Sequence, residues 1–125
     1  MTEQAVEGST SIADEVVANI AGVAAREVKG VSKLGASSIR RAIVERLGAT
    51  GTKTRGVEVE VGKKEAVVDL SITVVYGHNI PDVAERVRKN VAERLHDLCG
   101  LVAKEVNLNI VAIDFPEQAP QPRVA

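Results

Sequence analysis

An unbroken succession of strand, helix and strand patterns between residues 66 and 113 constrains the fold of this chain more than any other feature. Apolar side chains occupy alternate positions along residues 66–76 and again along 102–113. Because successive side chains of a strand point to opposite faces, this alternation predicts two strands that each carry one apolar face. Those faces need a cover, so we expect helices to pack on them.

The segment between the two strands carries a strong helix signal. Asn79 is suited to accept a hydrogen bond from an early backbone N–H, and Pro81 fits the first turn of a helix. Gly100 is suited to a left-handed C-cap. We therefore predict a helix over residues 80–98. Its apolar face is expected to consist of Ile80, Val83, Ala84, Val87, Val91, Leu95 and Leu98.

The first half of the chain predicts a second long helix, a short helix and one more strand. The long helix is expected to run from Ser11, its predicted N-cap, to Glu27. Residues 30–35 form either a short strand or an extended link, 38–47 have the apolar spacing of a short helix, and 57–61 alternate as a strand. The long helix is expected to bury Ile12, Val16, Ile20 and Val23, with Val17, Ala21 and Ala24 widening the stripe.

These elements fit one domain. We expect a flexible leader over residues 1–8, a single domain over 9–115 and a flexible, proline-rich tail over 116–125. A chain of 125 residues supports one core, and its 45% content of apolar residues excludes a wholly disordered protein. The predicted fold class is α+β: a two-layer domain with a mostly antiparallel sheet and two long helices packed on one face.

Motifs for catalysis and cofactor binding are missing from the sequence. No glycine-rich nucleotide cradle occurs, and His78, His96 and the single cysteine, Cys99, do not have the spacing of a metal site. Cys99 is predicted to be a boundary core residue at a helix C-terminus, where the dipole disfavours a thiolate. We expect no enzyme activity and no catalytic, cofactor-binding or metal-binding residues. No apolar run approaches the roughly 20 residues of a membrane span, so a cytoplasmic protein is expected.

Two surfaces are candidates for binding a partner. One is the sheet face opposite the helices, which is expected to show Asp69, Thr73, Glu105, Asn107 and Asn109. This face is either an ordinary solvated surface or an interface. The last strand adds an edge without proline and with Lys104 as its single central cation, which favours self-association or partner binding there.

The second candidate surface is basic. Residues 26–64 contain ten Lys and Arg residues against four acidic ones, although the net charge of the chain is −1. This segment is either a solvated loop and helix face or a site for phosphates of RNA or anionic lipid. Its glycine loop, 48–51, lacks the second helix that a KH-type RNA-binding domain needs. The candidate residues of this patch are Arg40, Arg41, Arg46, Lys53 and Arg55.

Several runs taken together resemble a known family. They are SIADEVV (11–17), EVKGV (27–31), GVEVEV (56–61), VDLSITVVYGHNIP (68–81) and CGLVAKEVNLNI (99–110). These runs resemble the alkaline shock protein family of Gram-positive bacteria, also called the envelope stress response family, and the similarity spans residues 9–115. Two departures are visible: Cys99 stands where the family usually has threonine, and residues 32–55 are more basic than expected.

The resemblance implies a function by association. It implies a non-catalytic cytosolic protein in envelope stress response or cell-envelope homeostasis, without a cofactor. The implied partners are further copies of the chain and a membrane-anchored protein that recruits it to the inner face of the cell membrane, without direct transmembrane insertion. The alternative is a nucleic-acid-binding module that uses the basic 26–64 surface.

Overall fold

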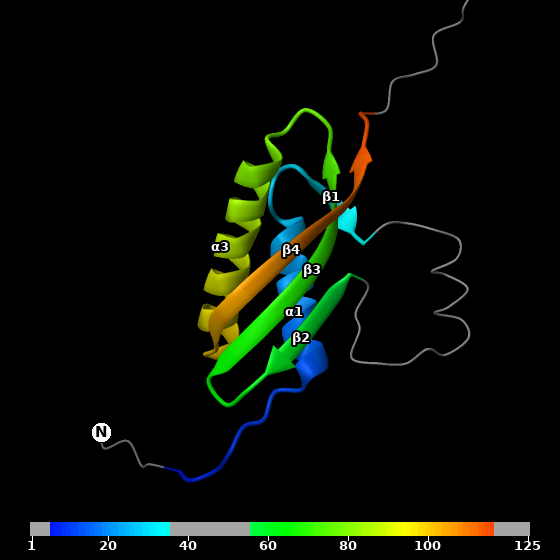
Figure 1. The fold of residues 1–125 in the computed structure, drawn as a ribbon. Helices are drawn as coiled ribbons and strands as arrows, with labels where there is room; N and C mark the ends of the chain where they lie inside the picture. The colour runs from blue at the N-terminus through cyan, green and yellow to red at the C-terminus, as the bar shows by residue number, and fades with distance from the viewer. Residues whose placement is uncertain (1–5, 36–55, 117–125) are drawn as a thin grey trace, which may run out of the picture.

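The computed structural model describes residues 6–35 and 56–116, which form two helices and a four-stranded sheet (Figure 1). The predicted short helix over 38–47 lies outside the described residues. The elements in chain order are α1 (Asp14–Arg26), β1 (Val31–Leu34), β2 (Val57–Val61), β3 (Glu65–Val75), α3 (Ile80–Cys99) and β4 (Val102–Asp114).

The strand β3 is the centre of the sheet. On one side β4 runs parallel to it, and on the other side β2 and β1 both pair with it in antiparallel register. Because α3 carries the chain from the end of β3 back to the start of β4, these two strands become parallel neighbours. The predicted two-layer α+β fold is confirmed. Two of the three strand pairings are antiparallel, and the parallel pairing is the longest.

The strands β1 and β2 share one side of β3 end to end and meet at Ser71. The backbone N–H of Gly35 donates to the carbonyl of Ser71 at 2.6 Å, and the N–H of Ser71 donates to the carbonyl of Gly56 at 2.8 Å. Gly56 has a φ of +73°, and a Cβ there would lie 2.6 Å from the nitrogen of Gly35. This position therefore requires glycine.

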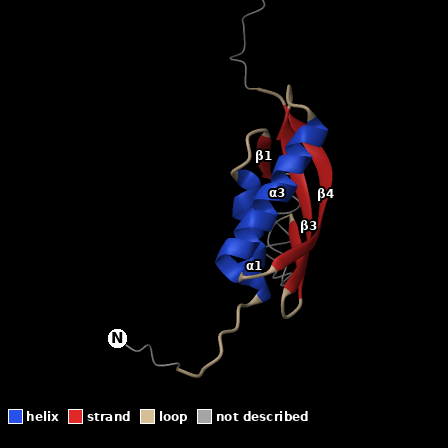
Figure 2. Ribbon diagram, turned by 90° about the vertical axis from the view of Figure 1, so that its left-hand side faces the viewer, coloured by secondary structure: helices blue, strands red, loops and turns tan. Residues whose placement is uncertain are grey.

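Both helices lie on the same face of the sheet, and the core fills the space between the two layers (Figure 2). The side chains of β3 alternate as predicted, and those that point toward the helices are fully or almost fully buried. These buried residues of β3 are Ala66, Val68, Leu70, Ile72 and Val74.

The helix α3 has the N-cap and the C-cap that the sequence predicts. The side-chain oxygen of Asn79 accepts a hydrogen bond from the N–H of Asp82 at 3.0 Å, and Gly100 closes the helix in left-handed geometry. The predicted face is correct except at its last residue, Leu98, whose side chain is 64% exposed. The fully buried residues of α3 are Val83, Val87, Val91 and Leu95.

The helix α1 corrects two predictions. It begins at Asp14, and its N-cap is Ala13 without a side-chain hydrogen bond, so the predicted cap at Ser11 is wrong. The predicted main stripe is also wrong, because Val16 and Val23 are 45% and 49% exposed. The helix instead buries the residues predicted only to widen the stripe and their small neighbours: Val17, Ala18, Ala21, Gly22, Ala24 and Ala25.

Candidate functional site

The sheet face opposite the helices brings most of the predicted residues together. Asp69 of β3 is registered with Asn107 of β4, and the amide nitrogen of Asn107 donates to the carboxylate of Asp69 at 2.9 Å. Glu105 and Asn109 flank this pair, opposite Val67 and Ser71 respectively. No described helix covers this side of the sheet (Figure 2).

The strand β2 adds two carboxylates to the same face. Glu58 is registered with Asp69, and Glu60 is registered with Val67. A shallow hollow of about 290 Å³ at one end of this surface is lined by Glu60, Val67 and Lys104, among others. Among these described residues, four side chains are acidic (Glu58, Glu60, Asp69 and Glu105) and one is basic (Lys104), so this described part of the surface is acidic in character. We call it the open sheet face: Glu58, Glu60, Asp69, Glu105, Asn107 and Asn109.

Thr73 does not belong to this surface, which corrects the prediction for that residue. Its side chain is fully buried, and its hydroxyl donates to the backbone carbonyl of Gly35 at 2.7 Å. Alternation along the strand places Thr73 on the same side of β3 as Asp69, but alternation within one strand does not report which of its side chains are buried by other segments. Thr73 therefore helps to hold the end of β1 against β3.

The outer edge of β4 is partly covered by α3. The carbonyl of Val106 accepts a hydrogen bond from Nε of Arg88 at 3.1 Å. Val106 is registered opposite Val68, whose backbone groups point toward β4, and in a parallel pair such a residue bonds to the two neighbours of its partner. The carbonyl of Val106 thus points away from β3, and Arg88 satisfies it on the free edge. The remaining described edge has no such partner from α3.

Sequence reasoning missed an aromatic pair at the end of the sheet. Tyr76 and Phe115, the single tyrosine and the single phenylalanine of the chain, stack with their ring centroids 5.2 Å apart. Both side chains are largely exposed. Each residue directly follows a strand, and strands that run parallel end at the same edge of a sheet. The sequence places Tyr76 and Phe115 at or near the ends of two predicted strands. This position predicts a contact between the two rings only once β3 and β4 are known to be parallel.

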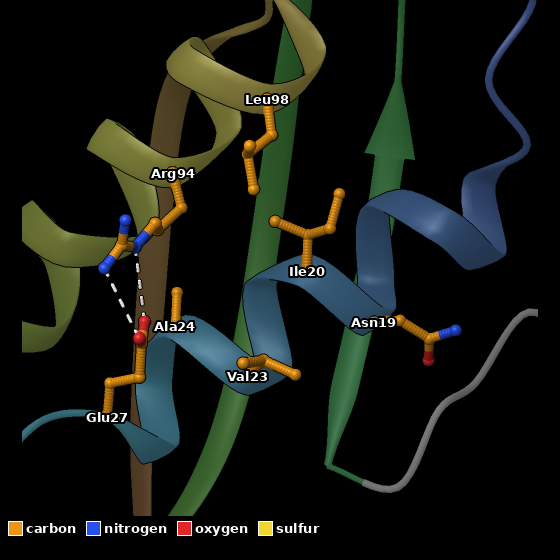
Figure 3. Close-up of a pocket in the computed structure, with 7 residues that line it drawn as sticks. All are labelled: Asn19, Ile20, Val23, Ala24, Glu27, Arg94 and Leu98. Atoms are coloured by element: carbon orange, nitrogen blue, oxygen red, sulfur yellow. Dashed lines mark hydrogen bonds and ion pairs between the residues drawn. The ribbon is translucent and has the colours of Figure 1, made fainter.

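A groove between the two helices is the second feature that the sequence did not predict. It has a volume of about 400 Å³ (Figure 3). Its apolar side chains are Ile20, Val23 and Ala24 from α1 and Leu98 from α3. At one end the carboxylate of Glu27 pairs with the guanidinium of Arg94, which donates to it at 3.3 Å. We call this feature the helix groove, with Asn19 completing its lining.

His96 and Cys99 are two of the remaining ionisable groups among the described residues. His96 is exposed and lies 3.4 Å from the carboxylate of Asp97. Burial raises the pKa of the Cys99 thiol above its ordinary value, which disfavours the reactive thiolate. Within residues 6–35 and 56–116, no three His, Cys, Asp or Glu side chains gather closely enough to hold a metal ion. Neither described helix combines the length and apolar character that spanning a membrane requires.

The predicted basic patch lies outside the described residues. This applies to each of its members: Arg40, Arg41, Arg46, Lys53 and Arg55.

Comparison with known proteins finds similarity over nearly the whole chain. The profile of the alkaline shock protein 23 family, described as having a cell envelope-related function, matches residues 2–115. The YqhY protein of Bacillus subtilis is 33% identical over 117 residues, covering 94% of this chain and 85% of that protein. A stress response regulator gls24 homolog of Streptococcus pyogenes is 30% identical over 121 residues, covering 97% and 67% respectively. The B. subtilis protein YloU is 29% identical over 107 residues, covering 85% and 88%. No solved structure matches significantly.

Proposed function

Because the chain belongs to the alkaline shock protein 23 family, which has a cell envelope-related function, we propose that it acts in envelope stress response by binding other proteins rather than by catalysis. The family and the stress response regulators among its relatives connect the chain with stress and the cell envelope. The proposed mechanism of association rests on the surfaces described above. It includes self-association and capture by a membrane-anchored protein at the inner face of the cell membrane, with the chain itself cytoplasmic.

The observation that carries this proposal is the open sheet face. A sheet face on which no described helix packs is a surface where a partner can pack. Here the hydrogen bond between Asn107 and Asp69 holds two of its polar side chains in place, so they need not be ordered again on binding. The acidic character of the face favours a partner segment with Lys or Arg side chains.

The test replaces two residues at the centre of this face. The double variant Asn107→Arg with Asn109→Arg adds two cations where a basic partner is expected, so it should lose partner capture while the fold remains. The readout is the peripheral fluorescence of the tagged chain in a Gram-positive host, together with in-cell crosslinking and mass spectrometry. The matched control is the double variant His96→Arg with Thr10→Arg, which adds the same charge at exposed positions on α3 and ahead of α1, away from this face.

The result that contradicts the proposal is equally definite. If the Asn107→Arg and Asn109→Arg chain still captures every crosslinked partner of the wild type, the open sheet face is only a solvated surface. Salt-sensitive retention on RNA, with no protein partner crosslinked, would instead favour the nucleic-acid-binding alternative for the basic 26–64 segment.

A further inference from the structure

The outward side of α1 is unusually apolar for a helix that already covers a core. Val16 and Val23 are about half exposed, and Ile20 between them is partly buried. These three positions follow one another at intervals of four and three, the spacing by which one helix packs along another. We call Val16, Ile20 and Val23 the α1 stripe.

Two residues of the stripe, Ile20 and Val23, also form one side of the helix groove, which supplies a matching recess. Ala24 is the smallest side chain that lines the groove. On the other side, Leu98 of α3 points toward Ile20 (Figure 3). Most of the surface of Leu98 is exposed. A small residue between larger ones leaves room for a side chain from another helix, as ridges pack into grooves. The molecule therefore carries a ridge and a recess next to each other on one face.

We infer that the helix groove receives the α1 stripe of a second copy of this chain, with the two α1 helices antiparallel across a twofold axis. In such an isologous contact each copy supplies the same surface, so a ridge adjacent to a recess serves both halves at once. Val23 of one copy then packs between α1 and Leu98 of the other. The inference concerns a different surface from the open sheet face.

The charges along α1 favour a second copy of the chain as the occupant of the helix groove, and they favour an antiparallel arrangement of the two α1 helices. Asp14 and Glu15 lie in the first turn, whereas Arg26 lies in the last turn and Lys29 follows it; the carboxylate of Glu27 at this second end is already paired with Arg94 of α3. An antiparallel second α1 places the acidic end of each helix against the basic end of the other, and it also opposes the two helix dipoles. A parallel pair would instead bring like charges together at both ends.

The antiparallel dimer would affect how the chain binds a membrane-anchored partner. This effect rests on the proposed function, whereas the dimer itself does not. If the two helix layers face each other, both open sheet faces point outward. One dimer then offers two identical sites to a membrane-anchored partner, and two linked sites bind an array of partners more tightly than one site does.

The first experiment removes the apolar contact. Val23→Glu with Leu98→Glu should weaken dimerisation by about tenfold or more, measured by sedimentation velocity over a concentration series of the full chain. Both side chains are exposed in the single chain, so circular dichroism should show an unchanged fold. The matched control, Val102→Glu with Val111→Glu, changes two comparably exposed valines of β4 and should leave dimerisation unchanged.

The second experiment tests the direction and the occupant. One variant carries Asp14→Lys with Glu15→Lys, and the other carries Arg26→Glu with Lys29→Glu. Each should dimerise more weakly by itself, because like charges then meet at both ends of the contact. An equimolar mixture should recover dimers, since one chain has two basic ends and the other two acidic ends. Recovery on mixing is not expected if each variant is merely less stable.

Several outcomes overturn the inference. One is a wild-type chain that stays monomeric at high concentration, and another is a mixture of the two charge variants that does not associate. A monomeric wild type whose Val23→Glu form loses its membrane-anchored partner would assign the groove to a foreign helix. The Asn107→Arg and Asn109→Arg chain should still form dimers, so loss of partner capture in that chain tests the proposed function separately.

Discussion

The helices α1 and α3 lie side by side on the same sheet, yet the side chains that they bury against it differ in size. The core side of α3 carries large side chains at intervals of four, from Val83 to Leu95. The core side of α1 consists mostly of alanine, while its valines at positions 16 and 23 face outward. A helical period therefore identifies both helices correctly, but the size of its apolar residues does not reveal which side is buried.

The distance between helix and sheet explains the difference. A Cβ at Gly22 would lie 2.9 Å from a methyl carbon of Leu34 and 3.4 Å from one of Val57, so α1 approaches β1 and β2 closely. Only small side chains fit so narrow a gap, because protein interiors are packed without free space. Apart from Val17, which is fully buried, the larger apolar residues of α1 lie on its outward side, where Val16, Ile20 and Val23 form the α1 stripe.

The largest effect is expected from a charge in the core of α3. Leu95→Asp should unfold the domain, because a buried carboxylate without a partner loses its hydration, and Val87→Asp should behave alike. Even Leu95→Ala should cost about 2–5 kcal/mol in urea unfolding. Leu98→Asp, three residues on and mostly exposed, is the control and should remain folded. Cooperative melting of Leu95→Asp would show that this face is wrongly assigned.

A smaller effect is expected from filling the narrow side of α1. Ala21 is fully buried, so Ala21→Leu should overpack the gap and lower the free energy of unfolding by about 1–3 kcal/mol. Val23→Leu changes an exposed side chain of the same helix and should stay within about 0.5 kcal/mol of the wild type. Equal losses in the two variants would mean that α1 has no narrow side.

The N-terminal caps of the two helices should also differ in their contribution to stability. Asn79→Ala removes the side-chain bond to the N–H of Asp82 and should cost about 1 kcal/mol in thermal or urea unfolding. Ser11→Ala should change stability by no more than about 0.5 kcal/mol, because α1 begins at Asp14 and makes no side-chain cap bond. If Ser11→Ala lowers the free energy of unfolding by a similar amount, Ser11 does act as the N-cap of α1.

The smallest effect is expected at Cys99, where α3 ends. Since burial raises the pKa of this thiol, its neutral form is favoured in the folded state, and alkylation at pH 8 should be slower than in the unfolded chain. The stabilisation is present below the ordinary pKa of the unfolded thiol and is lost as pH rises through the higher folded pKa. Cys99→Ser should therefore remove this alkaline dependence at a modest cost in stability. Faster alkylation in the folded chain would contradict the assignment.

Local patterns in the sequence are enough to predict three of the four strands, both long helices and, apart from Thr73, the grouping of polar residues on the open sheet face, whereas for residues 30–35 they allow either a strand or a link. These features depend on rules that act within one segment: the period of two in β3, the cap signals of Asn79 and Gly100, and the alternation that places Asp69 opposite the core. Alternation also places Asn107 on that face, but the register of β4 along β3 is what brings it beside Asp69.

Packing in three dimensions, by contrast, sets which neighbours these elements have. The parallel pairing of β3 with β4 brings Tyr76 to Phe115, the closeness of α1 to the sheet turns Val16 and Val23 outward, and the end of β1 buries Thr73. Each of these outcomes depends on a distance between segments far apart in the chain. A periodic pattern records only how the side chains of one segment are arranged around its own axis, so it contains no information about such distances.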